Sequence, residues 1–162
     1  MIYCTADTHF GHGNIIKFCN RPFGSVEEMN ETLINNWNST VNPDDEVYHL
    51  GDFGWKDNKL NLEILRRLNG TKYLLRGNHD KTLLRDNVIR NEFEWVKDYH
   101  ELEYEDSFFV MCHYAFRVWN RNYYGAINLF GHSHGKVEPL ENQLDVGVDL
   151  HNYTPICLSN IK

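Results

Sequence analysis

The stretch AINLFGHSHG, residues 126–135, joins an apolar run to two histidines that stand one residue apart between glycines. A short apolar run such as residues 126–130 is typical of a buried β-strand. His132 and His134 follow directly at its end. In an extended segment, residues i and i+2 point to the same side, so both imidazoles can reach one point. The stretch therefore predicts a strand that delivers two metal-binding side chains to one place.

The same arrangement recurs at the ends of four other predicted strands. These are residues 2–7 with Asp7 and His9, residues 46–50 with Asp52, residues 72–76 with Asn78, His79 and Asp80, and residues 108–113 with His113. Taken singly, Gly77–Asp80 could be a plain turn and His113 a packed core histidine. The carboxyl ends of parallel strands converge on one crevice, however. The ordered recurrence of these groups at strand ends therefore favours a metal site.

Helical signals separate the first strands. Ser25-Val-Glu-Glu28 is a capping box, and the apolar spacing after it predicts a helix to about residue 40. A second helix is expected over residues 60–68, closed by Asn69-Gly70. The first half of the chain thus alternates strand and helix.

The later half reads mostly as strands. Residues 95–104 and 108–113 alternate like an antiparallel hairpin, and residues 144–150 predict a further strand. There is no repeat, low-complexity tract or linker, so residues 1–162 are expected to form a single domain. This pattern predicts an α/β protein in which two sheets face each other.

Composition narrows the partners and the compartment. The net charge is −7 and no basic stripe is visible, so no extended nucleic-acid surface is expected. A small anionic substrate remains possible, because bound divalent metals reverse the local charge. Four scattered cysteines and the lack of a signal-like or membrane-length apolar run predict reduced thiols in a cytoplasmic protein with no membrane contact. The sequence leaves the oligomeric state undetermined.

The ordered motifs D-x-H, GD, GNHD, H and GH-x-H resemble those of the calcineurin-like metallophosphoesterases. The match extends from Asp7 to His134, and residues 8–16 with 21–23 also resemble a compact prokaryotic and phage-type branch of that family. The resemblance implies a two-sheet sandwich flanked by helices, the four-layer αββα fold. It also implies a metal-dependent phosphoester hydrolase.

The resemblance further implies two divalent transition-metal ions. Asp7, His9 and His134 would bind the first ion, Asn78, His113 and His132 the second, and Asp52 would bridge them. His79 would protonate the leaving group, with Asp80 placed to orient it. The mixed donors suit manganese first, with iron, nickel or zinc as alternatives. Two such ions would lower the pKa of a bridging water to roughly 7 and give a hydroxide nucleophile.

The pattern departs from the family after Gly51-Asp52. Many members carry an Asp or Arg shortly afterwards, which helps to orient the catalytic histidine or contacts phosphate, whereas this chain has Trp55 and Lys56. Trp55 is expected to do neither. Lys56 is a candidate phosphate contact, with a solvated surface lysine as the alternative.

Residues 114–125 are the candidate substrate segment. They hold five aromatic residues and two arginines and lead away from His113. Arg117, Trp119 and Arg121 could bind a nucleotide-like substrate by stacking and by charge, or the segment could simply cover a sheet edge. His12 and Asn14 are further candidates for the same cleft.

The function predicted from these observations is a phosphodiesterase that acts on small nucleotide-like or cyclic diesters. A phosphomonoesterase with the same metal chemistry is the nearer alternative. A non-catalytic binding scaffold and a nucleic-acid repair nuclease are the remaining ones.

Overall fold

A computed structural model describes residues 1–161 and contains two sheets. The first has the strand order β4-β3-β2-β1-β9. Its strands are β1 (Ile2–Thr5), β2 (Glu46–His49), β3 (Thr71–Leu75), β4 (Val96–Lys97) and β9 (Ile156–Cys157). Strands β1 to β4 are parallel and β9 runs antiparallel to β1. The carboxyl ends of β1, β2 and β3 therefore lie at one edge, as the sequence predicted.

The second sheet has the order β5-β6-β7-β8. Its strands are β5 (Tyr99–Tyr104), β6 (Ser107–Cys112), β7 (Ile127–Phe130) and β8 (Gln143–Asp145). β5 and β6 form the predicted antiparallel hairpin, whereas β6, β7 and β8 are mutually parallel. The ends of β6 and β7 that precede His113 and Gly131 consequently lie at the same edge of this sheet.

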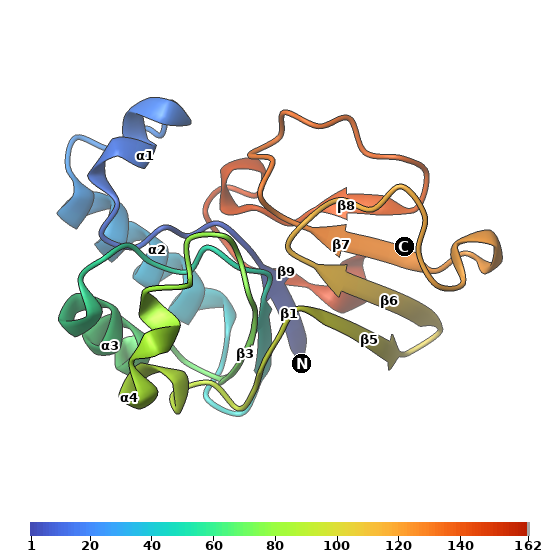
Figure 1. Ribbon diagram of the computed structural model, residues 1–162, viewed down its shortest axis with the longest axis horizontal. Helices are drawn as coiled ribbons and strands as arrows, with labels where there is room; N and C mark the ends of the chain where they lie inside the picture. Colours follow the sequence, from blue (N-terminus) through green and yellow to red (C-terminus); the bar gives the residue numbers. More distant parts are fainter. Residues whose placement is uncertain (162) are drawn as a thin grey trace.

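The α-helices lie on one side of the sandwich, with β1, β3 and β9 between them and the sheet of β5 to β8 (Figure 1). They are α1 (Gly13–Phe18), α2 (Val26–Thr40), α3 (Asn58–Arg67) and α4 (Asn87–Arg90). Within residues 1–161 no α-helix follows Arg90, so the first half of the chain supplies these helices. The two-sheet sandwich flanked by helices is confirmed; within residues 1–161 its α-helices form one outer layer, against the first sheet. No helix in this part of the chain has the length and apolar character needed to cross a membrane.

The predicted helix boundaries are close to the observed ones. The Ser25 hydroxyl accepts the backbone N–H of Glu28 at 3.1 Å and so caps α2. α3 begins two residues earlier than expected because the Asp57 carboxylate accepts the N–H of Leu60 at 3.0 Å and acts as its cap.

Two strand predictions were wrong in part. Residues 95–104 do not form one strand, because β4 pairs with β3 in the first sheet whereas β5 pairs with β6 in the second. Alternation predicts strands but not their partners. Residues 144–150 form a strand only to Asp145, and after Gly147 the chain turns into the 3-10 helix η3 (Val148–Leu150).

Two hydrophobic cores hold the layers together. One lies between the first sheet and the helices and includes Trp37, Ile64 and Leu74. The other lies between the sheets, where Leu50 and Leu75 face residues such as Met111 of the second sheet. Burial of each large apolar side chain contributes about 1.5–3 kcal/mol. These cores fix the two sheets so that both sets of strand ends open at the same place.

Candidate metal centre

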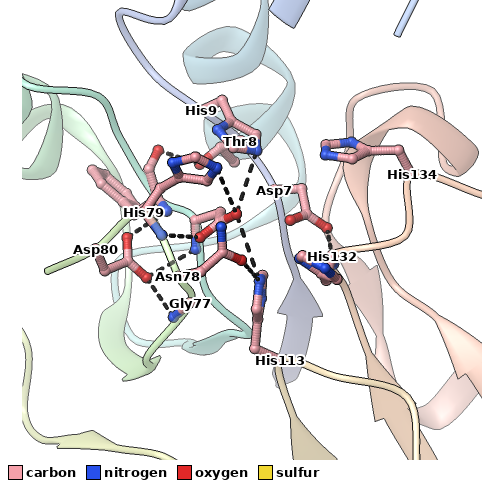
Figure 2. Close-up of polar contacts among 12 residues, drawn as sticks. Asp7, Thr8, His9, Gly77, Asn78, His79, Asp80, His113, His132 and His134 are labelled. Carbon is pink, nitrogen blue, oxygen red and sulfur yellow. Dashed lines mark hydrogen bonds and ion pairs between the residues drawn. The ribbon is translucent and has the colours of Figure 1, made fainter. Parts of the chain in front are cut away.

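Two groups of side chains that could hold metal ions lie side by side at the ends of the strands (Figure 2). The first group is Asp7, His9 and His134, and the second is Asp52, His113 and His132. Within each group the ligand atoms all lie within 4.8 Å of one another. The structure therefore brings together, from both sheets, six of the residues that the strand-end pattern singled out.

Asp52 lies between the two groups. Its Oδ2 atom is 3.7 Å from His9 Nε2 in the first group and 3.5 Å from His113 Nε2 in the second. Burial opposes ionisation of this carboxyl, but the hydrogen bond and charge of His113, with the charge of His9, lower its pKa below the usual value. An ionised carboxylate in this position has the geometry for a bridging ligand.

The seventh predicted ligand also reaches the centre. The Asn78 side-chain oxygen lies 3.1 Å from His113 Nε2, so its amide joins the second group. The backbone N–H of His132 donates to Asp7 Oδ2 at 2.7 Å and connects the two groups through the loop after β7. Carboxylate, imidazole and amide oxygen donors together suit a divalent transition metal.

Unpartnered buried atoms support the fit of this donor set to metal ions. Asp7 Oδ1 and both ring nitrogens of His9 are buried without a hydrogen-bond partner. Such orphaned polar atoms are costly in a folded protein unless a ligand satisfies them. Without a cation, burial raises the pKa of Asp7 to about 7. A bound divalent ion would reverse that shift and would complete the contacts that the protein alone leaves open.

The orientation of His113 is set by the backbone. Its Nδ1 lies 2.7 Å from the carbonyl oxygen of Leu50, so Nδ1–H donates there and Nε2 faces Asp52. Burial lowers the pKa of His113, but the hydrogen bond and charge of Asp52 outweigh it and raise the pKa above the usual value. In the neutral ring the proton on Nδ1 is held by Leu50, which leaves the Nε2 lone pair facing the second group, and a bound cation would favour that form.

Asp80 contacts backbone amides and not the ring of His79. Its two carboxylate oxygens accept the N–H groups of Asp52, Phe53 and Gly77 at 2.7–2.9 Å. Burial and the nearby charge of Asp52 raise the pKa of Asp80. Asp80 therefore ties the loop after β3 to the loop after β2, and any influence on His79 passes through the backbone.

His79 lies at the rim of the centre. Its backbone N–H donates to Asp52 Oδ1 at 2.8 Å, and its Nε2 is 4.0 Å from Asp52 Oδ2. The side chain is 36% exposed, so a substrate that arrives from solvent can reach its ring. Figure 2 shows its ring next to that of His9, on the side of the cluster away from His113.

Among the substrate-binding candidates, His12 lies beside the two ligand groups. Its ring stacks on Trp55 with centroids 3.9 Å apart and lies 6.3 Å from the His79 ring. The ring centroids of Trp55 and His79 are also 5.1 Å apart, so Trp55 packs against His79, although it was not expected to help orient that histidine. Lys56 lies 5.1 Å over the Trp55 ring, on the solvent side, and Asn14 is exposed in α1.

The other three candidates lie elsewhere. Trp119 donates to the carbonyl of Ala126, at the amino end of β7, and Arg121 lies over the Phe108 ring at 4.3 Å. Arg117 lines a hollow with Trp119 and the residues before β8. Because β6 and β7 are parallel, the chain must return to the far edge of the sheet between them. This return carries Arg117, Trp119 and Arg121 away from the metal-binding groups.

Five of the proposed ligands have left-handed backbone conformations. They are Asp7 (φ 57°), His9 (φ 51°), Asp52 (φ 57°), His132 (φ 68°) and His134 (φ 49°). Non-glycine residues adopt this region at a cost, and such strain clusters at functional sites. The bends turn the side chains back toward the space between the two groups.

Sequence reasoning missed the contacts of Arg21 and Asp149 with the candidate centre. Asp149 Oδ2 lies 2.7 Å from His134 Nδ1, and the Arg21 guanidinium is paired with the same carboxylate. Burial alone would raise the pKa of Asp149, but the hydrogen bonds from His134 and Arg21 outweigh that effect, so the pKa lies below its usual value. Arg21 was part of a family-like stretch, whereas Asp149 stood inside a predicted strand and gave no signal.

Comparison with known proteins identifies a family and two relatives, of which one matches almost the whole chain and the other about half of it. The family model for calcineurin-like phosphoesterases matches residues 1–156. An uncharacterised protein of Methanocaldococcus jannaschii is 38% identical over 99% of this chain and 88% of its own length. The gene 66 protein of Mycobacterium phage L5 is 37% identical over 47% of this chain and 38% of its own length.

Solved structures agree with the fold. A protein of unknown function from Aquifex aeolicus superimposes with a TM-score of 0.74 at 26% identity and covers 96% of this chain and 94% of its own. An archaeal phosphodiesterase superimposes with a TM-score of 0.51 at 20% identity, over 90% of this chain and 81% of its own, and shares the fold.

Proposed function

The chain belongs to the calcineurin-like phosphoesterase family and is a hydrolase of phosphoester bonds; we propose that it is a phosphodiesterase that uses two divalent metal ions. The single observation that carries this proposal is the position of Asp52, whose Oδ2 lies between His9 and His113 at 3.7 and 3.5 Å. A carboxylate shared between two sets of donors is the arrangement that a dinuclear hydrolytic site requires.

We propose that Asp7, His9 and His134 hold one ion and that Asn78, His113 and His132 hold the other. Manganese is the first candidate, because the donors mix imidazole nitrogens with oxygens; iron, nickel and zinc are alternatives. Bound there, two ions would supply a nucleophile from water at neutral pH and would neutralise phosphate oxygens.

His79 has the role of general acid in this proposal. The alcohol that leaves a phosphodiester needs a proton, and His79 is the partly exposed imidazole beside Asp52. Its backbone is fixed by Asp52 and its ring packs near Trp55. The stacked rings of His12 and Trp55 form the wall next to it and supply a surface for the group that departs.

A diester is favoured over a monoester because the buried arginine near the proposed ligands is already paired and is not free to bind phosphate. Arg21 is the buried arginine near the ligands, and its guanidinium is occupied by Asp149 and by the carbonyls of Asp7 and Thr8. A monoester carries up to two negative charges and gains from a free cation, whereas a diester carries one. The rim beside His79 is aromatic, built from His12 and Trp55, and this supports recognition of the less charged substrate.

The wider setting is consistent with a small substrate. The net charge of −7 disfavours a long nucleic-acid backbone, so we propose a small nucleotide-like or cyclic diester. The four cysteines are free, which supports a reducing compartment, the cytoplasm.

The test is a panel of metals against a panel of esters. The protein is stripped with a chelator, reloaded with Mn²⁺, Ni²⁺, Zn²⁺ or Mg²⁺, and assayed on bis-(p-nitrophenyl) phosphate, p-nitrophenyl phosphate and 2′,3′- and 3′,5′-cyclic nucleotides. We expect metal-dependent hydrolysis with a higher kcat/KM on diesters. Turnover of the monoester alone would replace the diesterase by a phosphatase, and inactivity with every metal would favour a binding scaffold.

A matched pair of variants tests the bridge. Asp52→Asn should lose both bound metal and activity, because an amide supplies one neutral oxygen in place of two charged ones. Asp98→Asn changes a carboxylate that pairs with Arg76 on the surface and should leave both properties unchanged. Normal metal content in Asp52→Asn would contradict the bridging role.

A further inference from the structure

We infer that Arg21 and Asp149 form a positioning pair that fixes the ring orientation and tautomer of His134. This inference rests on the proposed metal site. The three residues form one line of contacts: Arg21 Nε and Nη2 lie 2.7 and 3.0 Å from the two oxygens of Asp149, and Asp149 Oδ2 lies 2.7 Å from His134 Nδ1.

The guanidinium uses its full set of donors. Besides Asp149, it donates from Nη2 to the carbonyl of Asp7 at 2.7 Å and from Nη1 to the carbonyl of Thr8 at 3.0 Å and the sulfur of Met29 at 3.4 Å. The Arg21 side chain is completely buried. Only the planar fork of arginine can meet a carboxylate and two carbonyls at once. Arg21 thus fixes the loop that carries Asp7 and His9 and, through Asp149, the loop that carries His134.

The contact decides which nitrogen His134 offers. A carboxylate accepts hydrogen bonds, so the proton of the neutral ring is held on Nδ1, and Nε2 keeps its lone pair. His134 is grouped with Asp7 and His9, and its ring stacks near that of His9 with centroids 5.3 Å apart. The pair therefore prepares a donor for the first ion before any ion binds.

The same contacts argue against Asp149 as a ligand itself. Cys19, His134 and Asp149 also come within 4.8 Å of one another, so a third metal position is conceivable. Both Asp149 oxygens, however, already accept hydrogen bonds from Arg21, and one of them also meets His134 Nδ1. An ion at that position would have to displace a buried arginine.

The backbone that carries Asp149 is held by the fold, independently of the side-chain contacts with Arg21 and His134. It lies in η3, and the residue before it, Val148, donates its backbone N–H to the carbonyl of Ala6 at 3.0 Å. Ala6 and Gly147 also form a bridge beside the end of β1. The turn that carries the carboxylate is therefore docked on the strand that carries Asp7.

Two substitutions test the pair, with one matched control. Arg21→Lys keeps the charge but loses the fork, and Asp149→Asn keeps the shape but loses the charge. Arg67→Lys breaks a similar fork, which contacts Glu31 at 2.6 Å on the surface away from the site, and serves as the control. Bound Mn²⁺ is followed by calorimetry and elemental analysis, and the His134 tautomer by ¹⁵N imidazole shifts in metal-free protein.

We expect the wild type to show the Nδ1–H tautomer of His134 without metal. Each site variant should mix the tautomers and should bind one of its two Mn²⁺ equivalents at least tenfold more weakly, with the second equivalent and the control variant unaffected. An Nε2–H tautomer in the wild type would overturn the inference, as would Asp149→Asn with wild-type tautomer and affinities. If Arg21→Lys fails to fold, the tautomer of the wild type and the measurements on Asp149→Asn still test the inference.

Failure of the proposed function gives a different result. A wild type that binds two Mn²⁺ ions but hydrolyses no phosphoester would remove the phosphodiesterase proposal. The tautomer and the two affinities are measured without turnover, so they would still test the Arg21–Asp149 pair.

Discussion

The carboxylate of Asp80 accepts the backbone N–H of Asp52 at 2.8 Å. Through this hydrogen bond the loop after β3 holds Asp52, whose own carboxylate lies between the two ligand groups, in place. Asp80→Asn should weaken this contact and those to Phe53 and Gly77, because an amide offers one acceptor oxygen and introduces buried donors. We expect a loss of about 3 kcal/mol in the free energy of unfolding and a lower metal content. Denaturant titration of metal-free protein measures the first. Wild-type stability with full metal content would contradict this role.

Gly77→Ala should damage the site by steric overlap. A Cβ at this position would lie 2.2 Å from Asp52 Oδ1 and 2.4 Å from Asp52 N. Relief of that overlap must move Asp52, so we expect about 1–3 kcal/mol of destabilisation and loss of bound metal. Gly13→Ala is the control, because its Cβ would meet only Val26 at an ordinary 3.9 Å. Equal metal content in the two variants would be evidence against close approach as the reason for Gly77.

His79→Gln should keep both metals and lose proton donation. For substrates with alkyl leaving groups we expect kcat to fall by about 10²–10⁴-fold. The loss should be much smaller with p-nitrophenolate, which leaves without a proton. His100→Gln, at a histidine packed between Tyr48 and Trp95, is the control and should remain active. Normal hydrolysis of alkyl diesters by His79→Gln would mean that another group is the acid.

His12→Phe should raise KM with little change in kcat. Phenylalanine preserves an aromatic face against Trp55 but removes both ring nitrogens, one of which, Nδ1, is buried without a partner. A roughly tenfold rise in KM at constant metal content would indicate that His12 binds the substrate in the ground and transition states alike. An unchanged KM would leave His12 as a packing residue.

Acid sensitivity of the metal-free protein should depend on His49. Burial lowers its pKa to about 3, opposed by the charge of Asp52, and its ring contacts the Thr8 hydroxyl at 2.9 Å. The unfolded chain binds a proton near pH 6.5 and the folded protein does not, so His49 destabilises the fold as pH falls from about 6.5 toward 3. Across that range His49→Gln should have a shallower slope, by up to about 1.4 kcal/mol per pH unit. Identical slopes in urea titrations would refute the assignment.

The strand ends were predictable because they obey short-range rules. Apolar runs followed by glycine and polar residues mark where parallel strands stop, and the seven proposed ligands all follow such runs or turns. The structure brings these seven residues together, which the sequence could express only as an expected convergence. Helices α2 and α3 were also found, because capping residues and apolar spacing are local signals.

The failures have one cause, which is that pairing across the chain leaves no local mark. The contact of Arg21 with Asp149 spans 128 positions in sequence, and nothing near either residue indicates the other. Strands β4 and β5 are almost contiguous yet join different sheets. Trp119 and Arg121 were assigned to the site because they follow His113, but the parallel strands β6 and β7 carry them to the opposite edge.

The left-handed backbone at five ligands has a consequence for protein engineering. Each such residue costs roughly 1–2 kcal/mol relative to glycine. The metal-free protein therefore has a lower free energy of unfolding than the same fold would have with glycine at these positions. Bound ions offset this penalty by mass action. A selection for thermal stability in the presence of a chelator would therefore enrich glycine substitutions at Asp7, His9 or His132. The selected variants would be more stable but would lack activity.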